Sequence, residues 1–194
     1  MTRRIGVLAV QGDFLEHLNM LTALNVKALP VRLPRDLIDV DSLIIPGGES
    51  TTITRLMETF GLVEPIKNFA RQGNPVWGTC AGMIVAAKNV PDLDRKPLGL
   101  IDINVQRNAF GRQIDSFQTD IMITGLKNKP FPAIFIRAPI IQKVNSNVTI
   151  LSQLDDGTII AAQHNNVLVT AFHPELTTDT RVHELFLGLV NVER

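Results

Sequence analysis

The chain has 194 residues, of which 45% are hydrophobic and 20% charged, as is usual for one soluble globular domain, here residues 1–194. Lysine plus arginine and aspartate plus glutamate both total 19, and this zero formal net charge argues against a nucleic-acid partner. A single cysteine excludes an internal disulfide, and no apolar run is long enough to span a bilayer. We therefore expect a cytoplasmic protein with no membrane partner.

Strands and helices alternate through the first half of the sequence. Continuous apolar runs predict strands at residues 5–10, 26–31, 42–45 and 75–77. Helical spacing predicts helices marked by Phe14, Leu15, Leu18, Leu21 and Leu24, by Leu56 and Phe60, and by Ile66 and Phe69. This alternation predicts a parallel sheet, whose ligands bind beyond the carboxyl ends of the strands. Gln11-Gly12, Gly47-Gly48 and Cys80 each follow a predicted strand, so we expect them to meet there.

Short strands separated by turns are predicted after Lys88. They cover residues 98–105, 116–123, 133–136, 148–151, 158–162 and 167–172. Asp155-Asp156-Gly157 and His164-Asn165-Asn166 have the composition of hairpin turns. A closing helix is predicted over residues 179–190, because its apolar side chains recur at helical spacing. The sequence thus predicts one three-layer α/β domain, with a mostly parallel central sheet and antiparallel strands in the second half.

The only cysteine lies in a turn of small residues, Gly78-Thr79-Cys80-Ala81-Gly82. An apolar strand precedes the turn and a predicted helix over residues 83–88 follows it, as in a nucleophile elbow. Glycine at both flanking positions avoids a Cβ that would crowd the strained turn or the substrate. A helix N-terminus also favours the thiolate form of the side chain. The alternative is that Cys80 is a buried small hydrophobe, as free cysteines usually are.

His173 is the histidine best placed to act as the base for this cysteine. It follows the predicted strand 167–172, so it reaches the same edge of the sheet. Pro174 favours extended backbone at His173, and residues i and i+2 of an extended segment point the same way. We therefore expect His173 and Glu175 to hydrogen-bond, with the carboxylate fixing the imidazole tautomer as in a nucleophile–base–acid triad. The alternative is a plain strand exit with a solvated glutamate.

A third candidate segment has the sequence Pro-Gly-Gly-Glu-Ser-Thr-Thr over residues 46–52. Its paired glycines let the backbone approach a ligand and aim N–H groups at it. The N–H groups of Gly48 and Ala81 are expected to form an oxyanion hole. The alternative is a tight turn with a helix cap, whereas a phosphate-binding loop is disfavoured because the Walker lysine is missing. No histidine–carboxylate spacing indicates a metal site.

Five segments of the chain together resemble one family. They are residues 6–12 (Gly-Val-Leu-Ala-Val-Gln-Gly), 46–52, 78–82, 107–113 (Arg-Asn-Ala-Phe-Gly-Arg-Gln) and 172–176 (Phe-His-Pro-Glu-Leu). In this order they are similar to the glutaminase subunits of pyridoxal 5′-phosphate synthases, which are triad-type glutamine amidotransferases. The cysteine elbow and His-Pro-Glu are shared by the whole superfamily, whereas residues 107–113 and the Gln11-Gly12 start point to this member.

The resemblance implies a flavodoxin-like fold and a glutaminase that uses no cofactor. It implies that Cys80 is the nucleophile and that His173 and Glu175 complete the triad. The residues expected to contact L-glutamine are Gly47, Gly48, Glu49, Arg107, Ile136 and Arg137. The partner it implies is a synthase subunit that uses the released ammonia, together with a pentose phosphate and a triose phosphate, to build pyridoxal 5′-phosphate.

Two other functions stay open on the sequence alone. The first is a glutaminase subunit that serves a different biosynthetic synthase, for which the triad chemistry would be identical. The second is a non-catalytic binding or stress-response protein on the same flavodoxin-like fold. That second function predicts a Cys80 without reactivity toward glutamine and no requirement for Glu175.

Overall fold

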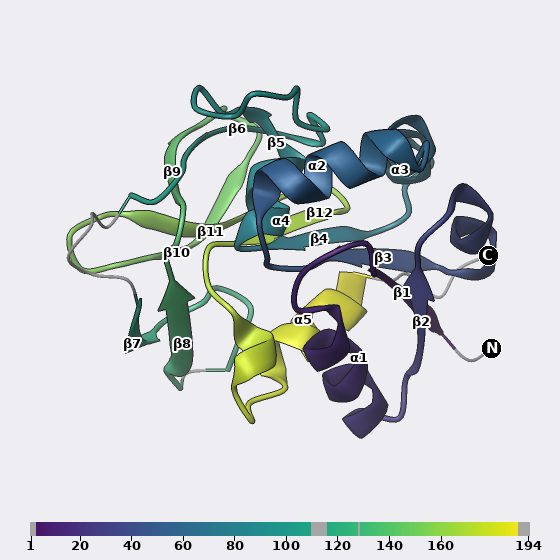
Figure 1. Ribbon diagram of the computed structural model, residues 1–194. Coiled ribbons are helices and arrows are strands. Elements are labelled where there is room, and N and C mark those ends of the chain that lie inside the picture. The colour runs from purple at the N-terminus through teal and green to yellow at the C-terminus, as the bar shows by residue number, and fades with distance from the viewer. Residues whose placement is uncertain (1–2, 110–115, 128, 190–194) are drawn as a thin grey trace.

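The computed structural model describes residues 3–109, 116–127 and 129–189. Five parallel strands in the order β2-β1-β3-β4-β12 form the centre of its main sheet (Figure 1). Their bounds are β1 Arg4–Leu8, β2 Lys27–Val31, β3 Ser42–Ile45, β4 Val76–Thr79 and β12 Val167–Thr170. This strand order is that of flavodoxin-like sheets, in which ligands bind beyond the carboxyl ends of the strands.

Helices cover both faces of the central strands. Their bounds are α1 Phe14–Ala23, α2 Ser50–Thr59, α3 Val63–Arg71, α4 Ala81–Ala86 and α5 Arg181–Leu189, with 3₁₀ helices η1 Pro34–Asp39 and η2 Pro174–Leu176. α1 and α5 lie on one face, and α2 and α3 lie on the other (Figure 1). Alternate strand residues serve the two cores, since Ile44 and Trp77 pack toward α1 and α5, whereas Leu43 and Val76 pack toward α2 and α3. The predicted three-layer arrangement is confirmed.

Antiparallel strands extend the sheet beyond β12, in the order β11-β9-β6-β5, with β10 paired to β11 and only the last pair, β6-β5, parallel. Their bounds are β5 Ala87–Asn89, β6 Ile101–Gln106, β9 Ile140–Val144, β10 Thr149–Gln153 and β11 Ile159–His164. A separate antiparallel pair consists of β7 Ser116–Ile121 and β8 Phe131–Ile136. The antiparallel pairing predicted for the second half is therefore confirmed, and Asn165 takes the positive φ of 50° that its hairpin turn requires.

Three expectations about individual elements were wrong. The helix predicted over residues 83–88 begins at Ala81 and ends at Ala86, because the chain turns into the short strand β5. Leu15 does not belong to the buried stripe of α1, since its side chain is 57% exposed and His17 and Leu21 are the buried residues. Phe60 caps the end of α2 and is exposed, whereas Ile53 and Met57 form the buried face of that helix.

The sequence interpretation also missed strand β9. Its outward side chains Gln142 and Lys143 interrupt the apolar run, and Pro139 directly precedes the strand. The last helix begins at Arg181 rather than at residue 179, where the Asp179 carboxylate accepts the backbone N–H of Arg181 at 3.1 Å. Its predicted end at residue 190 lies outside the described residues. No helix in the described ranges has both the length and the apolar character needed to cross a membrane.

Candidate active site

The turns after β1, β3, β4 and β12 meet at one edge of the sheet, as predicted. The N–H of Asp13 donates to the carbonyl of Gly47 at 3.0 Å, joining the first two turns. The N–H of Cys80 donates to the carbonyl of Thr170 at 2.8 Å, joining the other two. Gly12 is needed for the first of these contacts, because a Cβ on it would lie 1.8 Å from the Gly47 carbonyl oxygen. Close backbone approach therefore assembles the site.

Cys80 has the strained backbone of a nucleophile elbow. Its φ of 47° and ψ of −105° lie outside the regions that L-residues ordinarily occupy, a conformation that costs on the order of 1–3 kcal/mol. The two flanking glycines make the turn possible. A Cβ on Gly78 would lie 2.4 Å from the carbonyl oxygen of Gly82, and a Cβ on Gly82 would lie 1.9 Å from that of Ile45. Local geometry thus requires glycine at both positions.

His173 and Glu175 form the expected hydrogen bond, with 2.7 Å between Nδ1 of the imidazole and Oε1 of the carboxylate. Burial lowers the pKa of His173, but hydrogen bonds with Cys80 and Glu175 outweigh it and raise the pKa to about 10. Burial raises the pKa of Glu175, against the opposing effect of the His173 hydrogen bond. The three side chains can therefore hold a thiolate–imidazolium pair backed by a carboxylate, the charge distribution of a primed cysteine nucleophile.

Backbone contacts hold the imidazole of His173 in place. The backbone N–H of His173 donates to the carbonyl of Ile134 in β8 at 2.8 Å, which ties the small β7–β8 sheet to the site. Gly47 lies against the ring, since a Cβ on it would be 2.4 Å from His173 Cε1. Asp13 Oδ2 lies 3.5 Å from His173 Nδ1. Asp13, His173 and Glu175 bring potential metal ligands within 4.8 Å of one another, but the His173–Glu175 hydrogen bond already occupies Nδ1, the ring nitrogen a metal would use.

Glu49 and Arg107, both expected to bind glutamine, lie together. Arg107 Nη2 lies 3.6 Å from Glu49 Oε1, and Arg107 Nη1 donates to the carbonyl of Asp92 at 2.8 Å. The Glu49 carboxylate also caps α2, since it accepts the N–H groups of Thr51 at 3.0 Å and Thr52 at 2.7 Å. Burial raises the pKa of Glu49, but these hydrogen bonds outweigh it and the net pKa is lowered. A negative charge at this corner can face an ammonium group.

Ile136 and Arg137 lie on the other side of the cysteine. The carbonyl oxygen of Ile136 is 3.9 Å from Cys80 Sγ. Arg137 follows with an exposed side chain and a positive φ of 42°. The N–H of Ala109 donates to the carbonyl of Ala138 at 3.2 Å, so the segments that carry Arg107 and Arg137 are neighbours. The remainder of the motif, residues 110–113, lies outside the described residues.

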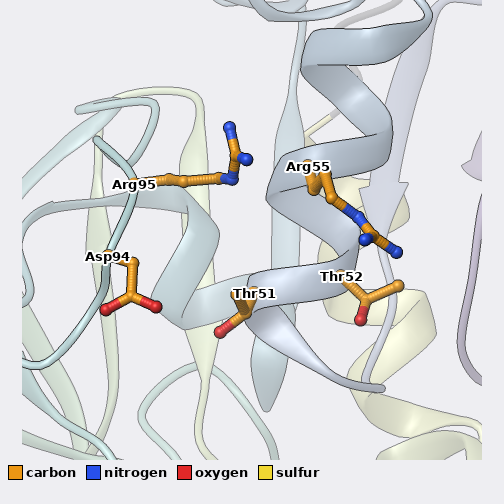
Figure 2. A pocket seen from close by; sticks show the side chains of 5 residues that line it. All are labelled: Thr51, Thr52, Arg55, Asp94 and Arg95. Atoms are coloured by element: carbon orange, nitrogen blue, oxygen red, sulfur yellow. The ribbon is translucent and has the colours of Figure 1, made fainter.

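A polar pocket borders the Glu49 corner. It is lined by Thr51, Thr52 and Arg55 of α2 and by Asp94 and Arg95 from the loop before β6 (Figure 2). The hydroxyl of Thr52 donates to Glu49 Oε2 at 2.7 Å, and Arg95 pairs with Glu58 on α2. Neither Cys80 nor His173 lines this pocket, so it flanks the site without containing the predicted nucleophile or base.

Sequence reasoning assigned no role to His17, His183 or Thr79, which are fully buried beneath the triad. His17 Nδ1 lies 3.0 Å from His183 Nε2, and His17 Nε2 lies 3.2 Å from Thr79 Oγ1. The available signal was helical spacing, because His17 stands three residues after Phe14 and four before Leu21, on the apolar face of α1. A histidine inside an apolar stripe has a buried polar partner.

The chain matches the model of the SNO glutamine amidotransferase family over residues 7–192. It belongs to that family. Its curated relatives include the pyridoxal 5′-phosphate synthase subunit PdxT of Dehalococcoides mccartyi, 55% identical over 188 residues that cover 96% of each chain. The corresponding subunit of Herpetosiphon aurantiacus is 56% identical over 188 residues, covering 95% of this chain and 99% of that one.

Solved structures agree with the family. A crystal structure of a glutamine amidotransferase aligns with a TM-score of 0.92 at 40% identity, covering 97% of this chain and 99% of that chain. PurLQS from Thermotoga maritima aligns with a TM-score of 0.72 at 16% identity, covering 98% and 100% of the two chains, which shows a shared fold only. The flavodoxin-like α/β class and the assignment as a glutamine amidotransferase are therefore both supported independently of the motifs that predicted them.

Proposed function

We propose that this chain is the glutaminase subunit of a pyridoxal 5′-phosphate synthase, with residues 1–194 acting as one glutaminase domain. The observation that carries the proposal is the contact set of Cys80, His173 and Glu175 at the edge of the sheet, within a glutamine amidotransferase family. The synthase assignment is supported by relatives named as subunits of that enzyme, which match over almost their full length. A cytoplasmic location is part of the proposal, because the thiol must stay reduced.

In the proposed reaction the Cys80 thiolate attacks the side-chain amide carbon of L-glutamine and forms a tetrahedral intermediate. As the carbon–nitrogen bond breaks, the His173 imidazolium gives its proton to the leaving nitrogen, and ammonia departs from a γ-glutamyl thioester. His173, now neutral, takes a proton from water while the water oxygen attacks the thioester carbon. The carbon–sulfur bond then breaks, and glutamate leaves with the thiolate–imidazolium pair restored. Glu175 orients the imidazole throughout.

The N–H groups of Gly48 and Ala81 are the proposed donors to the oxyanion. The Gly47 carbonyl points at Asp13, so the N–H of Gly48, on the same planar peptide, points to the opposite side. Ala81 directly follows Cys80, and the residue after the nucleophile is the usual source of the other donor. One oxyanion donor is worth roughly 10²–10³-fold in kcat.

Charge complementarity supports the proposed orientation of glutamine. Glu49 presents a carboxylate whose pKa is lowered, which suits the α-ammonium group. Arg137 has an exposed side chain and directly follows Ile136, whose carbonyl oxygen lies near Cys80 Sγ, so its guanidinium suits the α-carboxylate. Arg107 lies 3.6 Å from Glu49, and its segment is joined to that of Arg137 by the hydrogen bond from Ala109 to Ala138. Gly47 and Gly48 let the amide approach His173 without a Cβ in the way.

Ammonia in bulk water at neutral pH is mostly ammonium, which is not a nucleophile. A synthase subunit that takes ammonia directly from the glutaminase avoids this loss. The proposed acceptor is the enzyme that assembles pyridoxal 5′-phosphate from a pentose phosphate and a triose phosphate.

The test is release of glutamate and ammonia from L-glutamine, with and without the synthase subunit, using Cys80→Ser as the control. Glutamate formation that depends on Cys80, together with pyridoxal 5′-phosphate formation from glutamine, is expected. Hydrolysis without pyridoxal 5′-phosphate formation would reassign the acceptor, and no hydrolysis in the complex would refute the glutaminase activity.

A further inference from the structure

The carboxylate of Glu175 has one oxygen bound to His173 and a second that faces the protein interior. Within the described residues the buried Oε2 makes no conventional hydrogen bond. His17 Nε2 lies 3.4 Å from it, and the side chains of both residues have no exposed surface. His17 Nε2 also lies 3.2 Å from Thr79 Oγ1, one residue before the nucleophile.

The positions of the protons on the two histidines follow from which buried atoms lack partners. If His17 carried its proton on Nδ1, it would donate to His183 Nε2, and His183 would carry its own proton on Nδ1. That atom is buried without a hydrogen-bond partner among the described residues, so an N–H would be stranded there. The same tautomer would also turn the Nε2 lone pair of His17 toward the carboxylate of Glu175, so that two hydrogen-bond acceptors would face each other without a proton between them.

The opposite tautomer removes both problems. His183 Nε2–H then donates to His17 Nδ1, leaving only a lone pair unpaired on His183. His17 Nε2–H then lies 3.2 Å from Thr79 Oγ1 and 3.4 Å from Glu175 Oε2, measured from the nitrogen, and both oxygens are able to accept a hydrogen bond. Burial, followed by the nearby His183 and His173, lowers the pKa of His17 well below its usual value, and burial lowers that of His183 to about 3. Both rings are therefore neutral donors at physiological pH.

We propose that His17, held in its Nε2–H tautomer by His183, is a positioning residue that orients the Glu175 carboxylate toward His173. This inference rests on the proposed glutaminase function. His17 touches neither glutamine nor the thiol in this role, and it acts only through Glu175. The contacts with Trp77 fix both rings, since the centroid of Trp77 lies 5.6 Å from that of His17 and 4.9 Å from that of His183.

The pKa of Glu175 depends on the ionisable groups around it, and this pKa sets the pH dependence expected of the enzyme. His173 contacts it from its own segment, and Asp13, ahead of α1, raises the carboxyl pKa by its negative charge. His17 approaches from α1, and His183 of α5 acts through His17. Cys80 acts through its hydrogen bond with His173. Removing the His17 donor leaves the carboxylate less stabilised, so its pKa rises and the protonated, inactive form persists to higher pH.

The test compares His17→Phe with His17→Gln in the complex with the synthase subunit. Phenylalanine keeps a ring against Trp77 but cannot donate, whereas the amide of glutamine can place an N–H near the former Nε2 position. We expect His17→Phe to lower kcat about ten-fold with little change in KM, as for loss of a hydrogen bond to a charged group. Its acid limb of kcat/KM against pH should move upward, and His17→Gln should recover most of both effects.

Alkylation of Cys80 by iodoacetamide across the same pH range provides a readout that needs no glutamine turnover. A wild-type protein that reacts at Cys80 but hydrolyses no glutamine would contradict the proposed function, whereas the pH dependence of alkylation would still decide whether His17 positions Glu175. His164→Gln, a histidine at the end of β11, is the matched control and should behave as wild type. Acid limbs that coincide in His17→Phe and wild type would overturn the positioning role.

Nitrogen-15 spectra of the unmodified protein keep the proposal testable even if His17→Phe does not fold. They report directly which ring nitrogen carries the proton. Neutral Nε2–H signals for His17 and His183 across the neutral pH range are expected. An Nδ1–H tautomer at His17, or a charged His17 ring, would overturn the assignment.

Discussion

Replacing Gly47 with alanine tests whether contact with the backbone after β3 positions the base. The Cβ of alanine would lie 2.4 Å from His173 Cε1, 2.9 Å from Nδ1 and 3.0 Å from Asp13 Oδ2. Ordinary contact begins near 3.4 Å, so the ring has to move by about 1 Å. The ring is held by Glu175 on one side and by its own backbone on another, so this movement breaks the alignment with Cys80.

A displacement of about 1 Å at a catalytic group costs on the order of 10²-fold in rate. We therefore expect Gly47→Ala to lower kcat for glutamine hydrolysis by about that factor. Gly47 has no positive φ that would strain alanine, so the loss should arise from contact with the imidazole and not from backbone conformation. If Gly47 mattered only as a glutamine contact, KM would rise while kcat stayed near that of the wild type.

The control is Gly188→Ala in α5, where an added Cβ meets nothing within 4 Å among the residues that the structure describes. It should leave kcat unchanged and slightly increase stability, because alanine is the better helix former. Steady-state kinetics with saturating synthase subunit, together with thermal unfolding of both variants, separate the two effects. Wild-type kcat in a folded Gly47→Ala protein would refute the steric argument.

Three further predictions concern the triad and the histidines beneath it. Cys80→Ala should abolish glutamine hydrolysis while an added ammonium salt still supports synthesis by the partner; residual hydrolysis in a clean preparation would contradict a thioester route. Glu175→Gln should lower kcat by roughly 10²–10⁴-fold with KM largely kept, as measured by glutamate release, because the amide no longer favours the imidazolium; near-normal turnover would mean that another group orients His173. Because the folded-state pKa of His183 is about 3 and its ordinary value 6.5, the unfolded chain binds the extra proton between these pH values. The titration of His183 should then lower the free energy of unfolding by roughly 1.4 kcal/mol per pH unit as pH drops through this window. The lowered pKa of His17 acts in the same direction, so the slope should be smaller, but not zero, in His183→Phe. His173 does not add to this slope, because below its ordinary pKa of 6.5 it is protonated in both the folded and the unfolded protein. The stabilisation that comes from its raised pKa is lost only as pH rises toward 10. Equal slopes in urea unfolding series would refute the assignment.

The sequence predicts the edge of the sheet where the site lies because local rules govern it. Apolar runs followed by Gly12, Gly47 and Cys80 define parallel strands, and parallel strands bring their carboxyl ends together. The His173–Glu175 hydrogen bond follows from a proline that holds two residues in extended geometry. Each of these inferences uses residues within a few positions of one another.

What the sequence did not predict depends on contacts between distant segments. His17 and Glu175 are separated by most of the chain, and their approach depends on how α1 packs against η2, the 3₁₀ helix that carries Glu175. The contact of Arg107 with Glu49 likewise joins a loop to a helix cap. Helical periodicity also misassigned Leu15, because apolar spacing alone does not show that a polar ring, that of His17, takes the buried position on α1.

The choice of a neutral donor behind Glu175 has a physical reason. A lysine or arginine in place of His17 would satisfy Oε2 more strongly, but its charge would also draw the carboxylate away from the imidazolium and lower the pKa of His173. A second positive charge would sit beside His173 itself, which already lowers the pKa of His17. A neutral imidazole orients the carboxylate through its N–H and leaves the negative charge for His173. Burial keeps His17 and His183 neutral, whereas hydrogen bonds to Cys80 and Glu175 keep His173 charged, so three histidines in one chain serve two opposite purposes.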